Sequence, residues 1–140
     1  MSELVKRHIL CIQTLNRYKS ATLRRAIINN ADADLLCALA ECAYNILKKN
    51  IPLTPVQRQR LNKYKTKLRE LAKRGATAGR RRRILLQGLG RRNVPIGRRR
   101  RRGNNNKQFG EGQSGGFLAA LLAPLASSVI LPLLKQVLLK

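Results

Sequence analysis

The sequence has few aromatic residues and few acids. It contains three tyrosines, two phenylalanines and no tryptophan in 140 residues. Because single-stranded nucleic acids are held largely by bases stacked on aromatic rings, this scarcity argues against stacking as the main binding mode. Six acidic residues face 30 lysines and arginines, which leaves a net charge of +24. That charge predicts salt-sensitive binding to a polyanion, with nucleic acid as the first candidate and an anionic membrane surface as the second.

Histidine and cysteine are also scarce. His8 is the single histidine, and the cysteines are Cys11, Cys37 and Cys42. Cys37 and Cys42 lack the CxxC spacing of zinc sites, so we expect no metal and assign the thiols to apolar core positions. An odd cysteine count without a signal-peptide pattern at the N-terminus favours a reducing compartment. No glycine-rich phosphate loop follows a strand and the acids are scattered, so we expect neither enzyme activity nor a cofactor.

The first 75 residues carry helical periodicity. Apolar residues fall at helical spacing in residues 2–17 and 20–28, behind the candidate N-caps Ser2 and Ser20. A third helix opens at Asp32 or Ala33 and has a wide apolar face. The pattern predicts an all-α protein whose residues 1–75 form a small basic bundle of three or four helices.

The sharpest local signal begins a further helix at Thr54. Thr54 is placed as the N-cap, Pro55 at the first helical position and Gln57 at the third, which is a capping box. We expect this helix to run to about Lys73, with a narrow apolar seam at Leu61, Tyr64, Leu68 and Leu71. Its cations are spread round the other faces and are candidates for contact with phosphate: Arg58, Arg60, Lys63, Lys65, Lys67 and Arg69.

An arginine-rich, glycine-rich tract follows, and residues 76–116 are predicted to be disordered because like charges repel each other. Arginine binds phosphate bidentately and keeps its charge, so these clusters suit the backbone of duplex nucleic acid and also suit nuclear import. The predicted nucleic-acid-binding arginines are Arg80, Arg81, Arg82, Arg83, Arg91, Arg92, Arg98, Arg99, Arg100, Arg101 and Arg102.

The C-terminal segment, residues 117–140, is strongly apolar and is predicted to be one hydrophobic helix. It begins with 18 residues that carry no charge, at the lower limit for crossing a membrane. Pro124 and Pro132 disfavour a simple span, and Lys135 and Lys140 suit a helix that lies in the membrane interface. Three alternatives stay open: membrane contact, association with a partner such as a capsid protein or another copy, and an ordinary core helix.

Residues 41–72, the arginine tract and the glycine-led apolar end together resemble small basic core-type proteins of Maverick/Polinton-like elements and adenovirus-related viruses. Those proteins are similar to adenovirus core proteins, which package viral DNA. The resemblance implies a virion protein that also enters the host nucleus.

The same resemblance offers one account of the sequence LLQGLG. Maturation proteases of adenovirus type cut after a short pattern that Leu86, Gln87, Gly88 and Leu89 match, and Gly90 follows where the cut would fall. A processing site between Leu89 and Gly90 is therefore implied. The alternative is that this stretch is only an apolar staple or turn within the tract.

These features favour a non-enzymatic, sequence-independent DNA-binding and condensing core protein of a virus or virus-like element. One alternative is a membrane-active or membrane-anchored virion protein that uses residues 117–140. Another is an RNA-associated basic protein, since RNA offers the same backbone phosphates.

Overall fold

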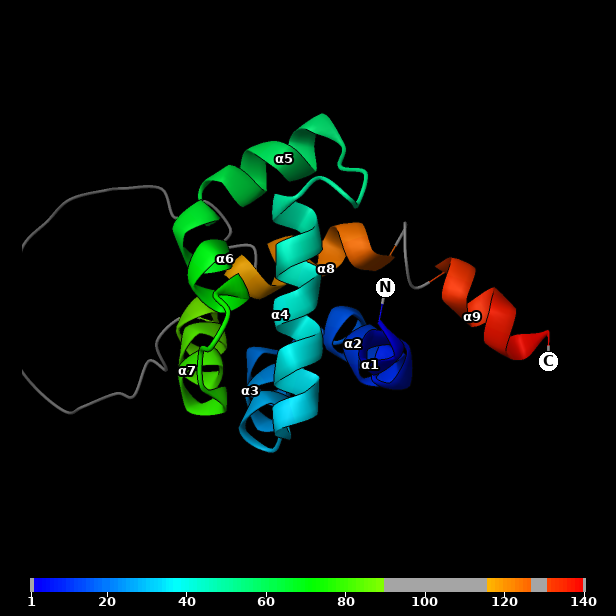
Figure 1. Ribbon diagram of the computed structural model, residues 1–140, viewed down its shortest axis with the longest axis horizontal. Coiled ribbons are helices and arrows are strands. Elements are labelled where there is room, and N and C mark those ends of the chain that lie inside the picture. Colours follow the sequence, from blue (N-terminus) through cyan, green and yellow to red (C-terminus); the bar gives the residue numbers. More distant parts are fainter. Residues whose placement is uncertain (1, 90–115, 127–130, 140) are drawn as a thin grey trace, which may run out of the picture.

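The computed structural model describes residues 2–89, 116–126 and 131–139, and within these ranges all regular secondary structure is helical (Figure 1). The predicted all-α class is therefore confirmed for this part of the chain. The helices are α1 (Glu3–Arg7), α2 (Ile9–Arg17), α3 (Ala21–Asn29), α4 (Ala33–Leu47), α5 (Pro55–Asn62), α6 (Lys65–Ala72), α7 (Ala78–Gly88), α8 (Gly116–Leu125) and α9 (Leu131–Leu138).

The helices begin where side-chain oxygens can accept from free backbone N–H groups. Ser2, Ser20 and Asp32 each cap a helix as predicted, and Asp32 Oδ1 accepts from the backbone N–H of Leu35 at 2.8 Å. The capping box of α5 is complete: Thr54 Oγ1 accepts from the Gln57 N–H at 3.2 Å, and Gln57 Oε1 accepts from the Thr54 N–H at 3.1 Å. Each cap satisfies donors that the helix itself leaves unpaired.

Two predicted helices are divided. Residues 2–17 form α1 and α2, which meet at His8, where the backbone leaves helical geometry at φ −98° and ψ 9°. The helix expected from Pro55 to Lys73 divides into α5 and α6 at Tyr64, whose φ is −111°. The Tyr64 ring packs edge-on against Phe117 at 5.8 Å between centroids. This division lets α5 pack on α8 while α6 packs on α4.

The core is built round α4, which runs through the middle of the molecule in Figure 1 and contacts α1, α6, α7 and α8. Leu36, Leu39 and Ala43 of α4 are fully buried, and so are Leu15 of α2 and Leu71 of α6. Alanines on α4 lack bulky side chains, so neighbouring helices can approach its backbone closely.

The apolar C-terminal segment forms two helices rather than the single helix predicted. α8 is part of the core: Phe117, Leu118, Leu121 and Leu122 are fully buried, and the helix packs against α2, α5 and α7. Within this chain, α8 is therefore a helix of the hydrophobic core. α9 stands apart from the other helices in Figure 1, with Leu131 56% exposed. Among the described helices none is long and apolar enough to cross a membrane.

The prediction of disorder throughout residues 76–116 is wrong for residues 78–88, which form α7. Thr77 Oγ1 caps this helix by accepting from the Arg80 N–H at 3.3 Å, and Ile84 and Leu85 are buried in the core. Burial of these two side chains offsets the repulsion within the arginine run. Residues 90–115 lie outside the described residues.

Candidate nucleic-acid interface

The four consecutive arginines of α7 divide into two pairs. Arg80 and Arg83 are exposed, whereas Arg81 and Arg82 are partly buried against the fold. Arg82 donates from Nη2 to the Ala31 carbonyl at 2.7 Å and from Nε to the Ile28 carbonyl at 3.3 Å. Arg81 donates from Nη1 to Cys37 Sγ at 2.8 Å. All four were predicted to bind nucleic acid, but two of them make structural contacts.

The Arg82 contacts fix α7 to the C-terminal end of α3. Ile28 belongs to the last turn of α3, where carbonyl groups lack the usual α-helical partner four residues ahead and carry partial negative charge. A guanidinium group suits that position because it supplies several donors in one plane. A sequence signal exists for Arg81: it is spaced four and seven residues from Leu85 and Gly88, which places the three on one helix face.

A basic groove lies between α3, α6 and α7, with a volume of about 700 Å³. We call it the α7 groove. The described residues that line it are Arg25, Lys67, Gly79, Arg82, Arg83, Leu86 and Gln87. Four of these seven residues are cationic and none is acidic. A second hollow is lined by Arg80, Arg83 and Glu70, so Arg83 borders two hollows of the surface.

The cations of α5 and α6 serve different surfaces. Arg58, Lys65 and Arg69 are exposed, and Lys67 is half-buried because it lines the α7 groove. Arg60 and Lys63 line a different cleft, beside α8. The six cations therefore lie on several surfaces, which agrees with their expected spread round the helix.

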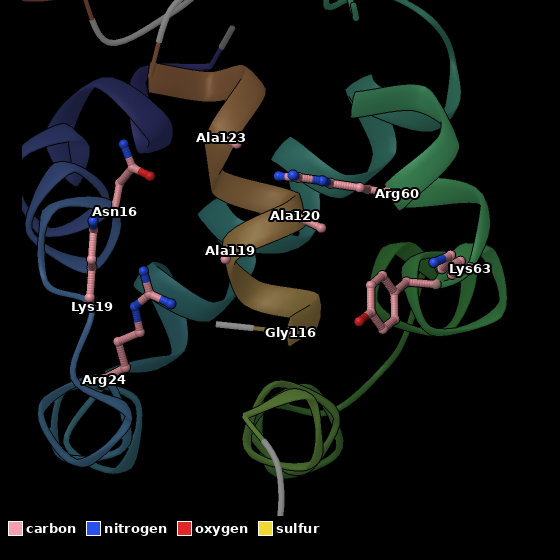
Figure 2. A pocket seen from close by; sticks show the side chains of 10 residues that line it. Asn16, Lys19, Arg24, Arg60, Lys63, Gly116, Ala119, Ala120 and Ala123 are labelled. Carbon is pink, nitrogen blue, oxygen red and sulfur yellow. The ribbon is translucent and has the colours of Figure 1, made fainter. Parts of the chain in front are cut away.

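The cleft beside α8, which we call the α8 cleft, has a volume of about 560 Å³. In Figure 2, Arg24 and Arg60 reach toward α8 from opposite sides, and alanines of α8 form the floor. Sequence reasoning missed Lys19 and Arg24 because each occurs in a short, ordinary basic context. The lining residues are Asn16, Lys19, Arg24, Arg60, Lys63, Tyr64, Gly116, Ala119, Ala120 and Ala123.

Arg24 is buried to an unusual degree for an arginine, with 3% of its surface exposed. Its Nε donates to the Leu15 carbonyl at 3.0 Å, near the C-terminal end of α2. Its Nη1 is also buried and has no hydrogen-bond partner among the described residues. Burial lowers the pKa of Arg24 because removal from water disfavours the charged form.

The acids cannot neutralise this surface. With six acids against 30 lysines and arginines, one-to-one pairing leaves at least 24 cations without an acidic partner. Three acids also have local tasks: Glu3 pairs with Lys6 at 2.7 Å, Asp32 caps α4, and Glu41 accepts from the backbone N–H of Ser2 at 2.9 Å. The chain therefore keeps a large excess of positive charge that its own acids cannot offset.

The thiols do not assemble a metal site. Within residues 2–89, 116–126 and 131–139, no group of three or more histidine, cysteine or acidic side chains is placed to hold a metal ion. Cys11 is exposed, Cys37 is half-buried and accepts from Arg81, and only Cys42 is fully buried. Burial raises the pKa of Cys42 to about 12.

The LLQGLG sequence ends α7. Gly88 is buried, and a Cβ atom built there would lie 2.5 Å from Phe117 Cδ1, so close packing on α8 requires this glycine. Leu89 is the half-buried C-cap of α7. Gly90 and the arginines at positions 91, 92 and 98–102 lie outside the described residues.

Comparison of this chain with known protein families, curated proteins and solved structures found no match.

Proposed function

We propose that this chain is a non-enzymatic protein that binds and condenses double-stranded DNA through the phosphate backbone, without reading sequence. The observation that carries the proposal is the α7 groove, whose described lining includes four cationic residues and no acid. In keeping with the resemblance described above, we assign it to the core of a virus or virus-like element, and thus to the virion and the host nucleus.

The α7 groove is suited to phosphate rather than to bases. Arg83 is exposed at its rim and Lys67 lines it from α6, so both can approach a phosphate without leaving the folded body. Guanidinium groups bind phosphate oxygens bidentately, and each neutralised phosphate releases condensed counterions. Seven further arginines follow α7 in the sequence, at positions 91, 92 and 98–102, and add charge for neutralising a packaged genome.

Salt dependence tests this mechanism. Fluorescence anisotropy with two unrelated duplexes of equal length should give equal affinities. Log K should fall linearly with log salt concentration, by about 0.9 for each phosphate neutralised. Affinity that differs strongly between the duplexes, or that barely changes with salt, would contradict the proposal. A matched RNA duplex in the same assay, and crosslinking in the source cells, decide between DNA and the RNA alternative.

Arg83→Gln tests the groove itself, with Arg17→Gln as the control. Both residues are exposed and both substitutions remove one positive charge, but Arg17 lies on α2 away from the groove lining. We expect Arg83→Gln to weaken duplex binding about fivefold more than Arg17→Gln and to reduce the salt slope by about one. Equal losses in the two variants would place the interface elsewhere.

A second candidate function concerns α9. Leu131 and Leu139 are 56% and 86% exposed, and Lys135 of the same helix is exposed too. Apolar side chains next to a lysine suit contact with the surface of an anionic membrane, or with a capsid protein or second copy. Co-sedimentation of the full chain with anionic vesicles tests the membrane role, and Leu131→Asp should reduce it. Unchanged sedimentation of that variant would exclude α9 as the membrane contact.

A further inference from the structure

The α8 cleft is built from several separate elements, and it is distinct from the α7 groove. Lys19 lies between α2 and α3, Arg24 belongs to α3, Arg60 belongs to α5 and Lys63 follows α5. None of these four residues lines the α7 groove. The volume of about 560 Å³ falls within the range of roughly 300–1,000 Å³ that is usual for small-molecule sites.

The charge of the cleft is unbalanced. Its described lining contains four cationic side chains and no acidic one, and Asn16 and Tyr64 add neutral polar groups. Four like charges along one cleft without an acid make its potential positive. An anion bound in the cleft would offset this charge.

Arg24 supplies the most specific evidence. The residue is 3% exposed, and its Nη1 is buried without a partner in the described part of the chain, although its Nε is hydrogen-bonded. A buried charge that lacks hydrogen-bond partners is costly, and an apolar residue of similar size would often be as stable. Arg24 lines the cleft, so its guanidinium group is near enough for the unpaired donor to serve a ligand oxygen there.

The floor of the cleft leaves space for such a ligand. Ala119, Ala120 and Ala123 of α8 are half-buried and face the cleft, while the leucines of α8 are buried in the core. Because these side chains are small, they leave room between α8 and the arginines on either side (Figure 2). Larger residues there would fill the space between α3 and α5.

We propose that the α8 cleft binds a ligand that carries two or more linked phosphoryl groups, held by Lys19, Arg24, Arg60 and Lys63. Four cations call for more negative charge than one phosphate brings, and guanidinium groups favour the paired oxygens of phosphate. Such groups occur in free oligophosphates, where they share bridging oxygens, and along a nucleic-acid strand, where a sugar separates them. Both offer a series of anionic phosphoryl oxygens to the cleft.

The first test titrates inorganic tripolyphosphate into the full chain at fixed ionic strength by calorimetry. Arg60→Gln is compared with Arg58→Gln, which removes the same charge from the same helix at an exposed position outside the cleft lining. We expect Arg60→Gln to weaken binding about tenfold, because a charge-assisted hydrogen bond is lost. Arg58→Gln should weaken it by about twofold or less, since only a screened surface charge is removed.

Ala120→Leu tests the cleft without a change of charge. The larger side chain should fill the space above α8 and abolish tripolyphosphate binding, whereas Ala21→Leu, at an exposed position of α3, should leave it unchanged. Circular dichroism checks that both variants fold. If Arg60→Gln matches Arg58→Gln and Ala120→Leu matches Ala21→Leu, the proposed site is wrong.

Duplex DNA then identifies the source of the phosphoryl groups. If saturating duplex prevents tripolyphosphate binding, and Ala120→Leu weakens the duplex more than Ala21→Leu does, the cleft takes phosphates of the nucleic-acid strand. If tripolyphosphate binds the protein–duplex complex with undiminished affinity, the ligand is a free oligophosphate. The effect of Arg83→Gln on duplex binding is measured separately. A negative result for the α8 cleft can therefore be distinguished from a negative result for DNA binding in the α7 groove.

Discussion

Two glycines of α7 occupy opposite surroundings. A Cβ at Gly79 would meet nothing within 4 Å, so Gly79→Ala should stabilise the fold by about 0.5 kcal/mol because alanine favours the helix. A Cβ at Gly88 would clash with the Phe117 ring, so Gly88→Ala should destabilise it by about 1–3 kcal/mol. Urea unfolding of both variants measures the two changes. Changes of the same sign would contradict the packing of α7 on Phe117.

The cysteines should differ in reactivity for the same local reasons. Cys11 is exposed, whereas burial raises the pKa of Cys42 to about 12. At pH 8, a thiol-specific reagent should modify Cys11 rapidly and Cys42 only on unfolding, since the thiolate is the reactive form. Because Cys42 ionises at lower pH in the unfolded chain, its contribution to stability should be lost as pH rises above about 9. Equal labelling rates for Cys11 and Cys42 in the folded chain would contradict this.

Among the elements, those with local signals were predictable. Ser2, Ser20, Asp32 and Thr54 cap the helices that the sequence placed behind them, because a cap depends on residues within one turn. The break at Tyr64 was not predictable, since the apolar seam continues across it and its packing partner, Phe117, is distant in the sequence. The surroundings of α8 could not be predicted, because an apolar composition does not show whether a helix packs on a membrane, on another protein or in the core.

The sequence did not predict α7, because its four arginines form one uniform run. In the structure Arg81 and Arg82 are partly buried, whereas Arg80 and Arg83 are exposed. Arg82→Gln should destabilise the chain by about 1–3 kcal/mol, since it removes donors from the Ile28 and Ala31 carbonyls. Arg83→Gln should change stability by less than about 0.5 kcal/mol, since Arg83 is exposed. Thermal unfolding compares the two variants at equal net charge. A milder effect for Arg82→Gln would contradict its role in fixing α7 to α3.

The difference between arginines that make structural contacts and arginines that are exposed also limits how far the candidate interface could be predicted. The sequence predicted phosphate contact for the lysines and arginines, but it did not predict that Arg81 and Arg82 make structural contacts. Nor did it predict that Lys19, Arg24, Arg60 and Lys63 line one cleft. Those arrangements join α7 to α3 and α4 and place cations of α3 and α5 along one cleft, and no local pattern encodes which distant elements come together.

For the whole molecule, a net charge of +24 means that the folded chain repels itself. Raising NaCl from about 10 to 300 mM should therefore increase the melting temperature of the free protein, because screening shortens the range of that repulsion. The same change should weaken duplex binding, so salt acts on the two properties in opposite directions. Calorimetric scans across this range measure the first effect, and a melting temperature that falls steadily with salt would contradict it.

The contact between Gly88 and Gly116 has a topological consequence. A Cβ at Gly116 would lie 2.8 Å from the Gly88 carbonyl oxygen, so the chain leaves α7 and re-enters α8 at nearly the same place. The C-terminal end of α7 and the N-terminal end of α8 therefore lie side by side. After a cut between Leu89 and Gly90, α8 would stay docked through its own buried side chains. The two pieces would separate only on dilution, since docking would then be bimolecular.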